Sequence, residues 1–194
     1  NIAARGNEAR TRTLAYFKNV VDIAAELGAE QVMVSSGWAF LNEPIEDAWG
    51  RSASMLRAIA EHAGGRGVRL VLEALQPVES MIVNSAADTK RMIEAVDHPA
   101  LKACLDLGAM AIDDYFDLLG DDVAHVHFVD VAADGTTHLA WGDGDRDMRA
   151  DLDRLGARGY RGGVSAETYD GRYFADPAAA DAQVMAEYRR AIGA

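Results

Sequence analysis

The chain has 194 residues and a formal net charge of −12. This length allows one domain with a sizeable core, and the acidic balance argues against a nucleic-acid partner, which requires a basic face. No apolar run reaches the roughly 18 residues that a membrane span needs. Cys104 is the only cysteine, so the chain has no internal disulfide and is compatible with a reducing cytosol. We therefore expect a cytoplasmic protein without a membrane or nucleic-acid partner.

Short apolar segments alternate with amphipathic segments along the chain. The apolar segments predict strands over residues 31–35, 70–73, 101–106, 123–130 and 163–167. The amphipathic segments predict helices over residues 10–27, 46–63, 85–96, 115–119 and 148–155, and from residue 176 onward. Ser85 and Asp176 are the expected N-caps of two helices, and Val184, Tyr188 and Ile192 are the expected buried stripe of the last. The alternation is typical of βα units.

The pattern predicts an α/β fold, a (β/α)8 TIM barrel, of which this chain supplies about the last five βα units. A closed barrel takes about 250 residues, and this chain opens on a helix without a preceding strand. We expect residues 1–194 to form a single, partial TIM-barrel domain, with about three units ahead of residue 1. A complete, open five-stranded sheet is the alternative.

Carboxylate and imidazole side chains, which can ligate a metal or transfer a proton, lie at or near the ends of four predicted strands. Glu73, Asp106 and Glu167 close three strands, and His125 and His127 lie two apart on a fourth, so they point to the same face. Carboxyl ends of parallel strands meet at one edge of a sheet. Each acid alone is more often a helix cap or loop carboxylate, and a strand histidine is as often a hydrogen-bonded core residue. Because all four strand ends carry such a group, we expect them to converge.

The converging set is three carboxylates and one imidazole, namely Glu73, Asp106, His127 and Glu167. Carboxylates that face one another without a cation repel and are driven to protonate. Oxygen-rich donors with one nitrogen suit Mn²⁺, Mg²⁺ or Co²⁺ better than structural zinc. The sequence therefore predicts a divalent-cation site. His125, one layer deeper, is expected to pack with a hydrogen bond.

The order Glu, Asp, His, Glu on the last four strands resembles the sugar isomerase/epimerase superfamily, also called the xylose-isomerase-like barrels. Several loops are most similar to those of the fructoselysine 3-epimerase branch, and the similarity extends over essentially the whole chain. The matching stretches are Trp49-Gly50-Arg51, residues 72–80, 115–121 and 125–130, Thr137-His138, Gly142-Asp143-Gly144 and Arg158-Gly159-Tyr160.

The resemblance implies a metal-dependent epimerase or isomerase of a ketose or a fructoselysine-like ketose conjugate, with Mn²⁺ the expected metal. Glu73, Asp106, His127 and Glu167 become the metal ligands. Glu73 and Glu167 also become the acid/base pair that removes and returns a proton beside the carbonyl, through a cis-enediolate. A small-molecule sugar is the expected partner, and assembly into a homo-oligomer is left open.

Four further residues are candidates for substrate binding. The resemblance implies this role for Glu79, although Ala109 stands where many ketose 3-epimerases have the histidine that pairs with it. His138 and Arg172 lie in loops after strands, where solvated side chains are the commoner case. Trp38 is a candidate aromatic wall for a sugar face, with packing against the next helix as the alternative.

Three other functions compete with the epimerase hypothesis. A lyase on the same scaffold, such as an inositol-type dehydratase or a C-glycoside deglycosidase subunit, also begins with proton abstraction beside a carbonyl. A metal-dependent apurinic endonuclease would need more ligands and a basic groove, which the charge of −12 opposes. The third alternative is a non-catalytic fragment with an incomplete pocket.

Overall fold

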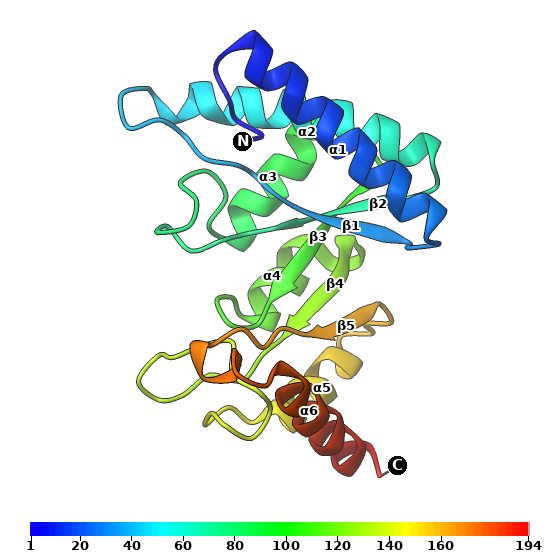
Figure 1. Ribbon diagram of the computed structural model, residues 1–194, viewed down its shortest axis with the longest axis vertical. Coiled ribbons are helices and arrows are strands. Elements are labelled where there is room, and N and C mark those ends of the chain that lie inside the picture. The colour runs from blue at the N-terminus through cyan, green and yellow to red at the C-terminus, as the bar shows by residue number, and fades with distance from the viewer. Residues whose placement is uncertain (194) are drawn as a thin grey trace. The chain divides into compact units, whose positions relative to one another are not determined.

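A computed structural model describes residues 1–193 and contains five strands that alternate with helices (Figure 1). The strands are β1 (Gln31–Ser35), β2 (Arg69–Glu73), β3 (Leu101–Asp106), β4 (Val123–Phe128) and β5 (Gly163–Ala166). The α-helices are α1 (Asn7–Glu26), α2 (Ile45–Gly65), α3 (Ala86–Val96), α4 (Ile112–Leu119), α5 (Met148–Ala157) and α6 (Pro177–Ile192). Two short 3₁₀ helices, η1 (Gly120–Asp122) and η2 (Gly171–Tyr173), complete the elements of the described chain.

The strands are ordered β1-β2-β3-β4-β5, which is their order in the sequence. The pairs β1–β2, β2–β3 and β4–β5 are parallel. This sequential order confirms the prediction of βα units from a TIM barrel, because a doubly wound sheet would reverse its order in the middle. Among the described residues, no helix is long and apolar enough to cross a bilayer.

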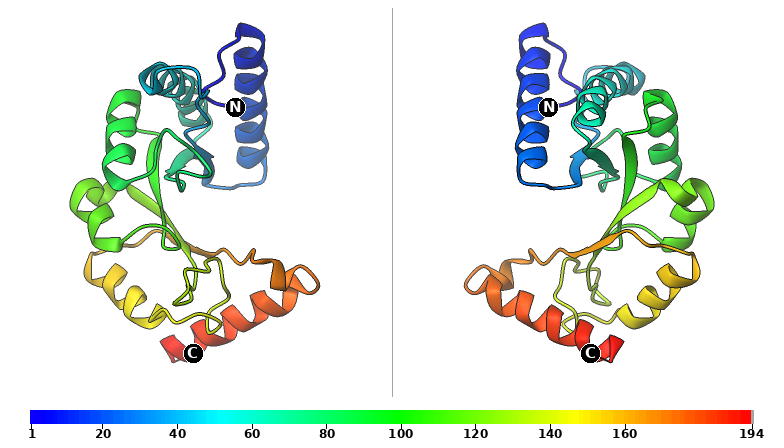
Figure 2. Two further views of the ribbon diagram at one scale, coloured as in Figure 1. Left: turned by 90° about the vertical axis from the view of Figure 1, so that its left-hand side faces the viewer. Right: turned by 90° about the vertical axis from the view of Figure 1, so that its right-hand side faces the viewer.

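The chain divides into two compact units. The first comprises Asn1–Cys104 and Asp117–Ala124, and the second comprises Leu105–Phe116 and the chain from His125 onward. In the first unit, α1 and α2 lie side by side (Figure 2), and α2 also contacts β2 and α3. Its core forms because α2 has an apolar stripe along one face, made of Ala48, Trp49, Met55, Leu56, Ile59, Ala60 and Ala63. Residues Leu70–Leu72 of β2 are buried as well.

The second unit buries aliphatic side chains around the ends of β3 and β4, among them Leu105, Leu107, Val126, Val129 and Leu139. A smaller cluster joins Ala140 to Tyr173, Ala180 and Val184 and receives the half-buried Trp141. The predicted stripe of α6 is wrong beyond Val184, because Tyr188 and Ile192 are 39% and 50% exposed. Apolar spacing identifies which residues share a helix face, but it does not say how much of that face another element covers.

Helix starts follow local side-chain chemistry. The Ser85 hydroxyl accepts a hydrogen bond from the backbone N–H of Asp88, and the Asp176 carboxylate accepts one from the N–H of Ala179. Both predicted N-caps are therefore confirmed. Two strands end earlier than predicted, β4 at Phe128 rather than Asp130 and β5 at Ala166 rather than Glu167.

Candidate metal centre

Three of the predicted ligands meet in the second unit. Asp106 is the last residue of β3, His127 lies on β4, and Glu167 directly follows β5. One donor atom from each lies within 4.8 Å of the other two. His127 Nδ1 and Glu167 Oε2 are 3.1 Å apart. Asp106 and His127 are buried, whereas Glu167 is partly buried, so the cluster is more accessible at Glu167 than at the other two residues.

The turn after β3 fixes Asp106. Its Oδ1 accepts a hydrogen bond from the N–H of Gly108, and the N–H of Leu107 donates to the carbonyl of His127. Gly108 is required by close packing, because a Cβ there would lie 2.5 Å from Thr137 Oγ1 and 2.9 Å from Val129 Cγ2. The end of β3 is thereby held against β4, which places the Asp106 carboxylate beside His127.

Glu167 is held in its ionised form. Hydrogen bonds from His127 and then His138 lower the pKa of its carboxyl from an ordinary 4.5 to about 2, and they outweigh burial, which acts in the opposite direction. A carboxylate that stays charged at neutral pH can ligate a cation or accept a proton.

His138 lies inside this cluster. Its side chain is buried, with Nε2 3.5 Å from Glu167 Oε2 and 3.9 Å from Asp106 Oδ2, and its ring centroid is 4.1 Å from that of Tyr169. The alternative of a solvated loop histidine is therefore wrong. Its backbone φ of 59° is in the left-handed region, which non-glycine residues adopt uncommonly. The surrounding loop must hold it there.

His125 lies on the same strand as His127, with ring centroids 5.4 Å apart and nearly perpendicular planes. Burial, and secondarily the charge of His127, lower the pKa of His125. Both effects disfavour the charged form of the His125 ring. A Cβ on Gly163 of β5 would lie 3.2 Å from its Nδ1, so β5 passes close to this ring.

Glu73 belongs to the first unit. It is the buried last residue of β2, in register with Ser35 of β1 and Cys104 of β3. The predicted position at a strand end is confirmed, and its participation in the metal cluster stays a prediction.

The loops that follow β1 and β2 are joined by serine hydroxyls. Ser36 Oγ lies 3.2 Å from Ser80 Oγ, and Ser80 Oγ donates to the carbonyl of Gly37. Glu79 is exposed, and its carboxylate accepts a hydrogen bond from the N–H of Gln76. A substrate role for Glu79 stays a prediction.

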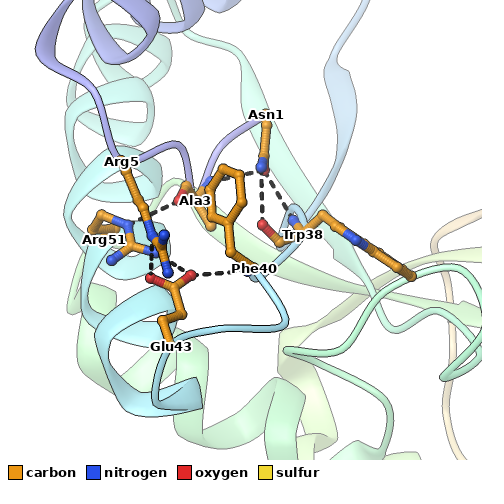
Figure 3. A network of polar contacts seen from close by, with 7 residues as sticks. All are labelled: Asn1, Ala3, Arg5, Trp38, Phe40, Glu43 and Arg51. Atoms are coloured by element: carbon orange, nitrogen blue, oxygen red, sulfur yellow. Dashed lines mark hydrogen bonds and ion pairs between the residues drawn. The ribbon is translucent and has the colours of Figure 1, made fainter.

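Trp38 lies in the loop after β1, which Figure 3 shows as part of a polar network. The Asn1 side chain accepts a hydrogen bond from the N–H of Trp38 and donates one to the Trp38 carbonyl. Trp38 is 40% exposed. Glu43 accepts from the N–H of Phe40 and pairs with Arg5 and Arg51. The loop is therefore held from both ends, and its partly exposed aromatic side chain is compatible with either alternative.

Arg172 is exposed in η2. Its guanidinium pairs with Asp170 at 3.0 Å and lies 5.9 Å above the Tyr173 ring. Its role in substrate binding also stays a prediction.

Sequence reasoning missed two carboxylates that build loops. Asp130 was expected only to end a strand, yet it accepts four backbone hydrogen bonds from the loop that follows. Glu43 gave no signal, since no local pattern joins it to Arg51, eight residues away, or to Arg5, 38 residues away.

Comparisons with known proteins agree with this architecture. The fructoselysine 3-epimerase of Shigella flexneri is 33% identical over 158 residues, which cover 79% of this chain and 57% of the relative. The 3-dehydroshikimate dehydratase of Pseudomonas putida is 30% identical over 172 residues, 80% of this chain and 26% of that protein. The chain thus spans little more than half the length of the epimerase that it matches.

Solved structures show the same fold. The D-psicose 3-epimerase of Clostridium cellulolyticum H10, crystallised with D-tagatose, superposes with a TM-score of 0.80 at 18% identity, covering 98% of this chain and 73% of the other. The family description "xylose isomerase-like TIM barrel" matches residues 1–191. The chain belongs to the xylose isomerase-like TIM-barrel family.

Proposed function

We propose that this protein is a divalent-metal-dependent epimerase that inverts a carbon beside the carbonyl of a ketose or of a fructoselysine-like ketose conjugate. The observation that carries the proposal is the approach of Asp106, His127 and Glu167 donor atoms to within 4.8 Å of one another. Family membership and the similarity to a fructoselysine 3-epimerase support the choice of reaction.

The donor set suits a hard or borderline divalent cation. Two carboxylates and one imidazole come from Asp106, Glu167 and His127, and we assign Glu73 as the fourth ligand. Oxygen-rich donors of this kind favour Mn²⁺, with Mg²⁺ and Co²⁺ as alternatives, over a structural zinc site. When bound, the cation polarises the substrate carbonyl and stabilises negative charge that develops on its oxygen.

The two glutamates act on the proton of the substrate carbon. Glu167, ionised at neutral pH because its pKa is near 2 in contact with His127 and His138, accepts the proton from the carbon next to the carbonyl. The substrate then has cis-enediolate character. Glu73, which enters the step protonated, delivers its proton to the opposite face of the same carbon and is left ionised. The carbon is thereby inverted, Glu167 is left protonated, and the pair exchanges roles in the reverse reaction. Glu79, His138, Arg172 and Trp38 are assigned to substrate binding.

A dehydratase is the second candidate, favoured by the similarity to a 3-dehydroshikimate dehydratase. Its chemistry would begin with the same proton transfer to Glu167, after which a hydroxyl leaves from the neighbouring carbon as water. Epimerisation preserves the mass of the substrate, whereas dehydration lowers it by one water. Mass spectrometry of the products separates the two candidates.

The Glu167→Gln variant tests the proposal. The amide keeps an oxygen that can face the cation but cannot accept the proton, so turnover should fall by roughly 10²–10⁴-fold. Glu187→Gln is the matched control, because Glu187 pairs only with Arg190 on the same helix in the contacts described. Solvent deuterium exchange at the inverted carbon shows whether Glu73 still acts on its own face. Inversion at the wild-type rate with unchanged metal content would overturn the proton-transfer role.

Several properties of the whole protein stay predictions. These are the single partial-barrel domain, the sugar as partner, homo-oligomer formation and the cytoplasmic location.

A further inference from the structure

The loop between β4 and α5, residues 129–147, can be followed in Figure 2. It is built around one buried carboxylate, that of Asp130. Asp130 is 1% exposed and accepts four backbone hydrogen bonds. Its Oδ1 accepts from Val131 at 2.8 Å and Arg146 at 3.1 Å, and its Oδ2 accepts from Gly142 at 2.9 Å and Gly144 at 3.1 Å. One side chain thus gathers both ends of the loop.

The same residue fixes the middle of the loop. The N–H of Asp130 donates to the carbonyl of Leu139, and the N–H of Leu139 donates to the carbonyl of Asp130, both at 3.1 Å. His138 directly precedes Leu139, so its backbone position is set by this bridge. Gly144 completes the fit, because a Cβ there would collide with the Asp130 carboxylate.

A second carboxylate, that of Asp143, holds the same loop through other partners. Asp143 accepts hydrogen bonds from the Tyr173 hydroxyl at 2.6 Å and from Gln183 at 2.8 Å, and Tyr173 accepts one from the N–H of Ala140. Asp130 and Asp143 both hold this loop, in which His138 has a left-handed φ of 59° and its Nε2 lies 3.5 Å from Glu167 Oε2. Non-glycine residues keep such a backbone only when their surroundings enforce it.

We propose that Asp130 is a positioning residue: it sets the loop that places His138 against Glu167, and through His138 it orients the Glu167 carboxylate for proton transfer. The inference rests on the proposed function for the role of Glu167 but not for the placement of His138. Asp130 itself is buried and does not belong to the cluster of Asp106, His127 and Glu167 donor atoms. A purely structural Asp130 would stabilise the loop without any coupling to His138.

Chemical labelling tests the placement of His138 without any substrate. Diethyl pyrocarbonate modifies accessible imidazoles, and peptide mass spectrometry gives the rate for each histidine, with His62 of α2 as an internal reference. In Asp130→Asn the new NH₂ group faces two N–H donors, so the loop should open and His138 should react at least tenfold faster than in the wild type. Asp145→Asn is the control, because Asp145 is exposed and its carboxylate accepts only from Ala133 in this loop.

An unchanged His138 rate in a folded Asp130→Asn protein would overturn the placement. Folding is checked by circular dichroism. If Asp130→Asn does not fold, Gly144→Ala disturbs the same carboxylate from the loop side and should also accelerate the labelling of His138. Protection of His138 in both perturbed proteins, or in whichever of them folds, contradicts the proposal.

A double-mutant cycle tests the coupling to catalysis. Asp130→Asn and His138→Ala should each lower kcat/KM by at least tenfold, and the kcat/KM of the double variant should be no lower than that of the more impaired single variant. Losses that multiply would show that Asp130 does not act through His138. If the wild type inverts no ketose, the proposed function fails, whereas the labelling result still decides how His138 is placed.

Discussion

Two loops of this protein are each organised by one carboxylate, but the partners of the two carboxylates differ. In the first unit, Glu43 holds the loop after β1 by accepting from one backbone N–H and by pairing with Arg51 at 2.6 Å and Arg5 at 2.7 Å. In the second unit, Asp130 holds the loop after β4 almost wholly through the backbone, with four N–H donors. Neither carboxylate is a predicted ligand, and each lies in a loop that carries a predicted site residue.

The two carboxylates hold their loops by different means: Glu43 relies on arginine side chains, and Asp130 relies on backbone N–H groups. Burial pushes the pKa of Glu43 upward, but hydrogen bonds from Arg51, the Phe40 N–H and Arg5 bring it down to about 2. Its hold on the loop therefore depends on charge. Asp130 instead supplies the hydrogen-bond acceptor for four backbone N–H groups of its own loop. Its loss should therefore damage the structure of the loop itself.

The largest expected effect follows from removing the Asp130 carboxylate, which accepts the backbone hydrogen bonds of its loop. Asp130→Ala leaves four part-buried N–H groups without their acceptor, so the free energy of unfolding should fall by roughly 2–4 kcal/mol. Urea denaturation measures this change. Asp145→Ala in the same loop should cost no more than about 0.5 kcal/mol, because surface substitutions are usually small. Equal losses in the two variants would break the comparison.

A smaller effect, visible through pH, should follow from Glu43→Gln. The pKa of Glu43 is lowered in the folded protein from 4.5 to about 2, so its ionised form stabilises the fold above about pH 4.5. That contribution is lost as the pH falls through the range from 4.5 to 2. The difference in unfolding free energy between wild type and Glu43→Gln should therefore shrink across this range.

The control for this prediction is Glu94→Gln, because Glu94 makes an exposed helical pair with Lys90 that contributes little. A wild-type minus Glu43→Gln difference that stays constant down to pH 2 would show that the Arg pairs do not act through charge. High salt should weaken the Glu43 contribution more than that of Asp130, since Glu43 pairs with the partly exposed Arg5 and salt screens charge pairs near the surface.

Local signals in the sequence predicted much of the fold. The caps Ser85 and Asp176 act on their own helices, and the ends of β2 and β3 at Glu73 and Asp106 follow from apolar runs that stop at an acid. Glu167 lies one residue beyond the end of β5, an error that boundary assignments commonly carry.

Features that depend on distant contacts could not be predicted. The burial of His138 requires a loop closed by Asp130 across as many as 16 residues, and no local pattern encodes that closure. Glu43 likewise acquires Arg5 from 38 residues away. The exposure of Tyr188 depends on what covers α6, which helical periodicity does not state.

The central claim is that Asp106, His127 and Glu167 bind a divalent cation, and calorimetric titration of the metal-free protein with Mn²⁺ tests it most directly. The wild type should bind one Mn²⁺ per chain, and His127→Ala should bind at least tenfold more weakly because one donor is removed. His62→Ala serves as the control, since His62 pairs with Asp22 between α1 and α2. Equal affinity and stoichiometry in the wild type and His127→Ala would contradict the account.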